Sequence, residues 1–204
     1  MPITNIPYYY TLDTRHDNPP WHMDAIHIQQ LYRLCERIRP RVVVEVGSYM
    51  GASTSAFAEA MRDGFIEQLR CHDTKPQPEL LKVLDHADDN ADSRRVQLSD
   101  IPYPAMPIYA DLILIDADHE HGAVLDTLAA LCMSCPHIVM HDSNTINIGL
   151  GCSGVDRAVK LLKKASGLKW HEDAVKRPGM WTHRGLFYAH HVFEDSGWLP
   201  GDLP

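Results

Sequence analysis

Residues 41–54 read Arg-Val-Val-Val-Glu-Val-Gly-Ser-Tyr-Met-Gly-Ala-Ser-Thr. A short continuous run of β-branched residues is typical of a strand that is buried on both faces of a parallel sheet. The run meets Gly47 and Gly51, and apolar residues then continue at helical spacing from Ala56. Glycine adopts the left-handed backbone conformation that a tight turn requires. The stretch therefore predicts a strand, a tight turn and a helix.

The rest of the chain repeats this alternation of strands and helices. Strands are predicted at residues 41–46, 68–72, 96–98, 111–115, 137–140, 168–171 and 185–190. Helices are predicted at residues 23–38, 78–86 and 155–165, with two more after residues 55 and 123. Such alternation indicates an α/β protein with a Rossmann-like, doubly wound, mostly parallel seven-stranded sheet and helices on both faces.

The length of 204 residues suits one α/β domain. Residues 1–22 are rich in proline, tyrosine and polar groups and have no periodicity, which predicts an N-terminal arm or lid. Residues 23–204 are expected to form a single domain, because no linker or low-complexity tract divides them.

The charge and the hydropathy pattern exclude several classes of partner. The formal net charge of -8 would repel a nucleic-acid backbone. No apolar stretch approaches the roughly 20 residues that span a bilayer, and the N-terminus lacks a signal-peptide core. Five scattered cysteines suit a reducing compartment better than a disulfide framework. We therefore expect a cytoplasmic protein that binds neither nucleic acid nor membrane.

Polar residues stand where the predicted strands end. In a doubly wound sheet the ligand lies beyond the carboxyl ends of the strands. Asp73, Asp116, His141 and Asp142 occupy such ends. The turn at Gly47 lacks the third glycine of a dinucleotide fingerprint, which favours a ligand without phosphates. The sequence thus predicts a ligand site at this edge of the sheet.

Residues 43–54 resemble the first motif of class I S-adenosylmethionine-dependent methyltransferases. The resemblance implies that the turn and the next strand ends bind S-adenosylmethionine, and that Asp73 accepts hydrogen bonds from the ribose hydroxyls. Ser99 and Asp100 occupy the place where this family contacts adenine. The residues assigned to the cofactor are Glu45, Gly47, Ser48, Gly51, Ser53, Asp73, Asp100 and Asp116.

The phrases at residues 115–119 and 139–143 resemble a branch of small-molecule O-methyltransferases that includes macrocin O-methyltransferase and the cephalosporin hydroxylase group. The resemblance implies a divalent cation, Mg, Mn or Zn, held by Asp116 and Asp142, with His141 in place of an acidic residue. It also implies that His119 acts as the catalytic base. Imidazole suits Zn or Mn better than Mg, so His141 leaves the identity and the use of the metal open.

These resemblances imply methyl transfer from S-adenosylmethionine to a hydroxyl of a small metabolite, with a divalent cation as an optional second cofactor. A nicotinamide-dependent oxidoreductase on the same kind of sheet is the first alternative. A non-catalytic methyltransferase-like binding protein is the second. The sequence leaves the oligomeric state open, a homo-oligomer included.

Overall fold

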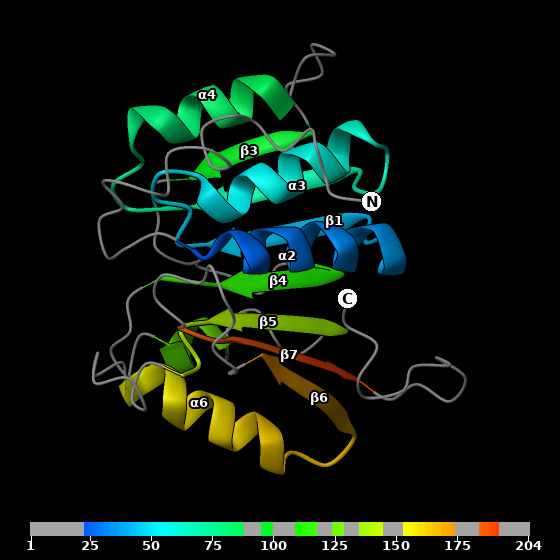
Figure 1. Ribbon diagram of the computed structural model, residues 1–204, viewed down its shortest axis with the longest axis vertical. Coiled ribbons are helices and arrows are strands. Elements are labelled where there is room, and N and C mark those ends of the chain that lie inside the picture. Colours follow the sequence, from blue (N-terminus) through cyan, green and yellow to red (C-terminus); the bar gives the residue numbers. More distant parts are fainter. Residues whose placement is uncertain are drawn as a thin grey trace.

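A single seven-stranded sheet organises the computed structural model, which describes residues 23–87, 95–99, 109–117, 124–128, 135–144, 153–173 and 184–191. The N-terminal arm predicted at residues 1–22 lies outside the described residues. The strands are β1 Val42–Val46, β2 Gln68–His72, β3 Val96–Ser99, β4 Leu112–Ile115, β5 His137–His141, β6 Leu168–Asp173 and β7 Leu186–His191. Figure 1 shows them stacked in the order β3-β2-β1-β4-β5-β7-β6, from top to bottom.

The sheet is mostly parallel, as predicted. Strands β1 to β5 pair in parallel with one another, whereas β7 pairs antiparallel with both β5 and β6. The last of the described strands, β7, is thus inserted between β5 and β6. Because parallel strands end at the same edge, the carboxyl ends of β1 to β6 lie together. The start of β7 joins that edge because its direction is reversed.

Helices cover both faces of the sheet. Helices α2 Ala25–Ile38, α3 Ala52–Arg62 and α4 Pro78–Ala87 share one core cluster with side chains such as Val43 and Leu112. Helix α6 Ser153–Lys164 and the helical residues 124–128 share the other cluster with Val44 and Ile113. Successive strand residues point to opposite faces, so each central strand contributes to both cores. This double burial is why the strands read as continuous apolar runs.

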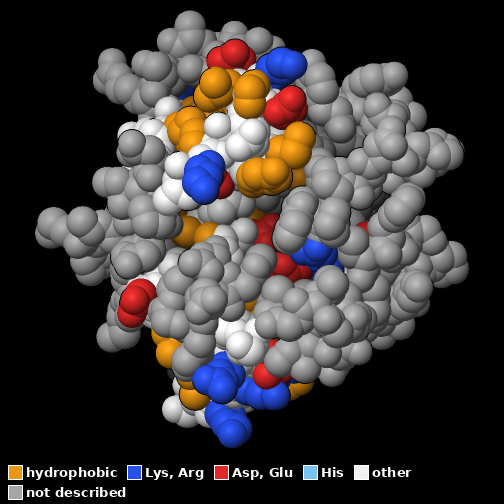
Figure 2. Space-filling view, turned by 90° about the vertical axis from the view of Figure 1, so that its left-hand side faces the viewer, with side chains coloured by type: hydrophobic (Ala, Val, Ile, Leu, Met, Phe, Trp, Pro, Cys, Tyr) orange, Lys and Arg blue, Asp and Glu red, His pale blue; other side chains and the backbone are white. Residues whose placement is uncertain are grey.

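The carboxyl edge of the strands faces the viewer in Figure 2, which is turned from Figure 1 to show its left side. Acidic side chains gather near the middle of that face, with a basic group beside them. Among the described residues, no helix is both long enough and apolar enough to cross a bilayer.

Candidate active site

Glu45 holds the glycine turn after β1 together. Its side chain is fully buried and accepts hydrogen bonds from the hydroxyls of Ser48 at 3.0 Å, Thr54 at 2.7 Å and Ser53. The Cys71 thiol on β2 adds a contact of 3.4 Å. Burial raises the pKa of Glu45, although the hydroxyl hydrogen bonds oppose that shift. The carboxylate therefore joins the strand, the turn and the first turn of α3 from the inside.

Both glycines of this turn have positive φ, as the sequence predicts. Gly47 has a φ of 92°, and a Cβ there would lie 2.2 Å from the carbonyl oxygen of Asp116. Gly51 has a φ of 88°, and its Cβ would lie 3.2 Å from the side chain of Val83 on α4. The close approach that requires Gly47 is made by the end of β4, so the turn and β4 are in direct contact.

Asp73 fixes the other side of the turn. Its carboxylate accepts hydrogen bonds from the backbone N–H groups of Tyr49 at 2.6 Å and of Lys75 at 2.7 Å. Tyr49 has a φ of 44°, a conformation that few side chains adopt without support. A carboxylate has about four acceptor positions, so these two bonds leave room for hydroxyl donors. Asp73 is thus a link between β2 and the turn with acceptor capacity in reserve.

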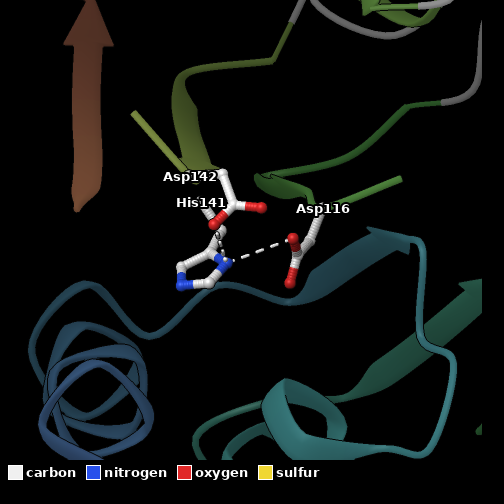
Figure 3. Close-up of side chains that lie close together, drawn as sticks. All are labelled: Asp116, His141 and Asp142. Carbon is white, nitrogen blue, oxygen red and sulfur yellow. Dashed lines mark hydrogen bonds and ion pairs between the residues drawn. The ribbon is translucent and has the colours of Figure 1, made fainter. Parts of the chain in front are cut away.

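Three predicted ligand residues come together at the ends of β4 and β5. Nδ1 of His141 lies 3.2 Å from Oδ1 of Asp116 and 3.4 Å from Oδ1 of Asp142, as Figure 3 shows. One donor atom from each residue lies within 4.8 Å of the others. His141 and Asp142 are buried, whereas the Asp116 side chain is 18% exposed. The trio therefore opens towards solvent on the Asp116 side.

The two carboxylates control the charge of His141. Burial alone lowers the pKa of an imidazole, but Asp116 and Asp142 outweigh that effect and raise the pKa of His141 to about 9. The imidazolium form lies between two anions and offsets their mutual repulsion. A histidine that holds its proton at neutral pH is a poor acceptor for a second one, so His141 does not suit the role of catalytic base.

Arg184 completes this cluster, and sequence reasoning missed it. Its Nη1 atom lies 3.2 Å from Oδ2 and 3.4 Å from Oδ1 of Asp142. Arg184 stands two residues before β7, the reversed strand beside β5. An arginine just before a predicted strand was the only signal, and it carries no information unless the direction of that strand is known.

Two buried polar side chains of α2 contact the ends of β5 and β6. The ring of His27 meets the ring of His141 edge-on, with 5.5 Å between centroids. Gln30, one helical turn later, donates a hydrogen bond of 2.8 Å to Asp173 at the end of β6. His27 thus packs α2 against the end of β5, and Gln30 links α2 to the end of β6.

Two predicted site residues, His119 and Asp100, lie outside the described residues. Ser99 ends β3, and its carbonyl oxygen accepts a hydrogen bond of 2.9 Å from the Asp73 N–H group. The other predicted positions fall into two groups at one edge of the sheet. The turn group is Glu45, Gly47, Ser48, Gly51, Ser53 and Asp73, and the charged group is Asp116, His141 and Asp142.

Residues 44–143, about half of the chain, match the family model of a methyltransferase domain. The match begins within β1 and ends one residue after Asp142, so it includes the turn group and the charged group. Arg184 and β7 lie beyond it. No curated protein matches the sequence significantly.

Solved methyltransferase structures share the fold at low identity. The O-methyltransferase TomG from Streptomyces achromogenes, in complex with SAM, has a TM-score of 0.61 and 17% identity, covering 91% of this chain and 95% of its own. An O-methyltransferase from Bacillus cereus, in complex with SAH, has a TM-score of 0.61 and 16% identity, covering 85% and 84%. An SAH-bound methyltransferase from Podospora anserina has a TM-score of 0.59 and 17% identity, covering 88% and 84%.

The domain match supplies the family, and the solved structures supply the fold. Together they identify the chain as a class I, S-adenosylmethionine-dependent methyltransferase.

Proposed function

We propose that this methyltransferase transfers the methyl group of S-adenosylmethionine to a hydroxyl of a small metabolite. The contact between Gly47 and the backbone of Asp116 carries the proposal. Because the glycine turn touches the end of β4, a cofactor seated on the turn lies beside the charged group. The methyl donor and a hydroxyl held near Asp116 would then meet at one point of the edge.

In the proposed cofactor site, the backbone of Gly47, Ser48 and Gly51 faces the ligand. The Asp73 carboxylate accepts hydrogen bonds from the ribose hydroxyls. Glu45 and Ser53 act through the turn rather than on the cofactor, since their side chains are buried and bonded to each other. Asp100 is proposed to lie near the adenine.

In the proposed reaction, the acceptor oxygen attacks the methyl carbon in line with the sulfur. The carbon–sulfur bond breaks, its electron pair stays on sulfur, and S-adenosylhomocysteine leaves. The hydroxyl proton passes to a base, for which His119 is proposed because imidazole titrates near neutral pH. The sulfonium is already activated, so alignment of the three reacting atoms supplies most of the rate.

A divalent cation is the optional part of the proposal. The convergence of two carboxylates and one imidazole nitrogen within 4.8 Å supports such a site. Asp116, Nδ1 of His141 and Asp142 would hold the cation, which would lower the pKa of the acceptor hydroxyl. The imidazole favours Mn or Zn over Mg.

Calorimetry tests the cofactor assignment directly. We expect S-adenosylmethionine and S-adenosylhomocysteine to bind, and NAD not to bind. Asp73→Asn should weaken binding of both compounds by about tenfold, the size of a lost charge-assisted hydrogen bond. Binding of NAD alone would replace the proposal with the oxidoreductase alternative.

His119→Ala tests the proposed base in a panel of phenolic and sugar-bearing acceptors. We expect kcat to fall by roughly 10²- to 10⁴-fold while cofactor affinity stays nearly unchanged. His171→Ala on β6 serves as the control, with kcat unchanged. Cofactor binding without turnover on any acceptor of the panel would favour the non-catalytic alternative.

A further inference from the structure

The carboxylate of Asp142 forms a buried ion pair with the guanidinium of Arg184. The Arg184 side chain is 7% exposed, that of Asp142 is not exposed, and Nη1 of Arg184 contacts both carboxylate oxygens. Asp142 has a φ of 61° in the left-handed region, so this backbone position needs support from outside. The guanidinium supplies that support across 42 residues of sequence.

The guanidinium is not saturated by this contact. Among the described residues, its buried Nε atom has no hydrogen-bond partner, and the same is true of the nearby Ser143 hydroxyl. A buried donor without a partner costs free energy, so hydrogen bonding alone does not account for an arginine at this position. Its full charge beside Asp142 is the feature that remains to be explained.

We propose that Arg184 is a built-in counter-ion that weakens and tunes the binding of a divalent cation at Asp116, His141 and Asp142. The inference rests on the optional metal site of the proposed function. Arg184 acts through Asp142, so it is a positioning residue. A cation entering between the donor atoms must share Asp142 with a fixed positive charge, and that charge repels it.

The charge balance gives the direction of the effect. With the His141 imidazole deprotonated, as a metal ligand must be, the two carboxylates bring two negative charges and Arg184 cancels one of them. Removing the guanidinium charge while keeping an amide donor should therefore leave Asp142 in place and increase its attraction for the metal. At separations of a few ångströms, even a strongly screened unit charge changes a divalent binding constant by tenfold or more.

The experiment measures Mn²⁺ binding to the protein without cofactor or acceptor, by calorimetry and by the electron paramagnetic resonance of free Mn²⁺. Arg184→Gln, which is neutral, should bind Mn²⁺ at least about tenfold more tightly than the wild type. Arg184→Lys, which keeps the charge, should bind within about threefold of the wild type. Arg70→Gln, on β2 and bonded to Gln68, is the matched control and should have no effect.

A second measurement covers the case in which the neutral variant is unstable. Mn²⁺ should take over the role of the missing charge, so it should raise the Tm of Arg184→Gln more than that of the wild type. Equal Mn²⁺ affinity in the wild type and Arg184→Gln, or a larger Tm rise in the wild type, would overturn the inference.

S-adenosylmethionine binding is measured in the same samples. If the wild type binds no cofactor, the proposed function fails whatever Mn²⁺ does. If the cofactor binds and the Mn²⁺ affinities of the variants do not differ, only the counter-ion role fails.

Discussion

Glu45 on β1 and Asp142 after β5 are both buried carboxylates at one edge of the sheet, but their neighbours differ. Glu45 accepts hydrogen bonds from three hydroxyls and a thiol, all neutral. Asp142 contacts a guanidinium and an imidazole. The hydroxyl partners of Glu45 lie within nine residues of it, whereas Arg184 lies 42 residues from Asp142. At Glu45 hydrogen bonds build a local scaffold, whereas at Asp142 an ion pair joins strands that are distant in sequence.

The contact between the glycine turn after β1 and the end of β4 predicts the largest effect on the free energy of unfolding. Gly47→Ala would place a Cβ 2.2 Å from the Asp116 carbonyl oxygen at a φ of 92°. The backbone of the turn and of β4 must separate, so we expect a loss of about 4 kcal/mol or more in the free energy of unfolding. Urea denaturation measures it.

Gly64→Ala is the matched control for that prediction. Gly64 has a φ of 74°, and within the described part of the chain no atom beyond its two sequence neighbours lies within 4 Å of an added Cβ. Only the backbone strain remains, and the cost should be about 1 kcal/mol. Equal losses in the two variants would show that the β4 contact does not constrain Gly47.

Neutralising the Asp142 carboxylate is expected to have the second-largest effect on the free energy of unfolding. Asp142→Asn leaves the Arg184 charge buried without an anion on it, which should cost about 3 kcal/mol of unfolding free energy. Combining it with Arg184→Gln should cost less than the sum of the single changes, as measured in a double-mutant cycle.

The exposed pair of Asp156 and Lys160 on α6 gives the control for an ion pair in water. Asp156→Asn should change the unfolding free energy by about 0.5 kcal/mol or less. Strict additivity of the Asp142 and Arg184 changes would show that this ion pair does not couple β5 and β7 energetically.

Changing the other buried carboxylate, that of Glu45, to an amide should cost less free energy of unfolding, because its hydrogen-bond partners are neutral. Glu45→Gln keeps one oxygen acceptor but turns the other oxygen into a donor that faces hydroxyls able to rotate. We expect a loss of about 2 kcal/mol, and a weaker affinity for the cofactor because the turn loosens. Thermal unfolding and calorimetry measure both.

Glu67→Gln, in an exposed pair with Arg41, is the control and should cost about 0.5 kcal/mol or less. If Glu45→Gln destabilised the protein more than Asp142→Asn, charged partners would not make a buried carboxylate more costly to neutralise than hydroxyl partners do.

The smallest effect concerns pH and the other histidine of β5. Burial, with a smaller contribution from His190, lowers the pKa of His137 to about 4, opposite to the shift at His141. Between pH 6.5 and 4 the unfolded chain then binds more protons than the folded protein at this position. The free energy of unfolding should therefore decrease by roughly 1–2 kcal/mol as the pH is lowered from 6.5 to 4. The effect is no larger because the side chain is only partly buried.

Denaturant unfolding at several pH values checks this prediction. His137→Gln keeps an acceptor for the Tyr188 hydroxyl, which lies 2.7 Å from Nδ1 of His137, but it cannot titrate. The variant should lose part of the pH dependence between pH 6.5 and 4. An unchanged slope would assign the acid sensitivity to other groups.

The sequence predicted the elements that depend on short-range patterns. Short, largely apolar runs between the predicted helices located the strands to within one or two residues, and the two glycines located the turn with its positive φ values. Asp73, Asp116, His141 and Asp142 were found because they directly follow or end such runs. These signals are local, since burial on both faces and left-handed backbone each restrict the residue type at its own position.

The contacts of those residues depend on the tertiary structure. The reversed β7 between β5 and β6 brings Arg184 to Asp142, and helix α2 brings His27 to His141. The neighbour that requires Gly47 is the Asp116 backbone, on a strand distant in sequence. Strand order and direction depend on how the layers pack, and no periodicity in the sequence encodes a partner that lies dozens of residues away.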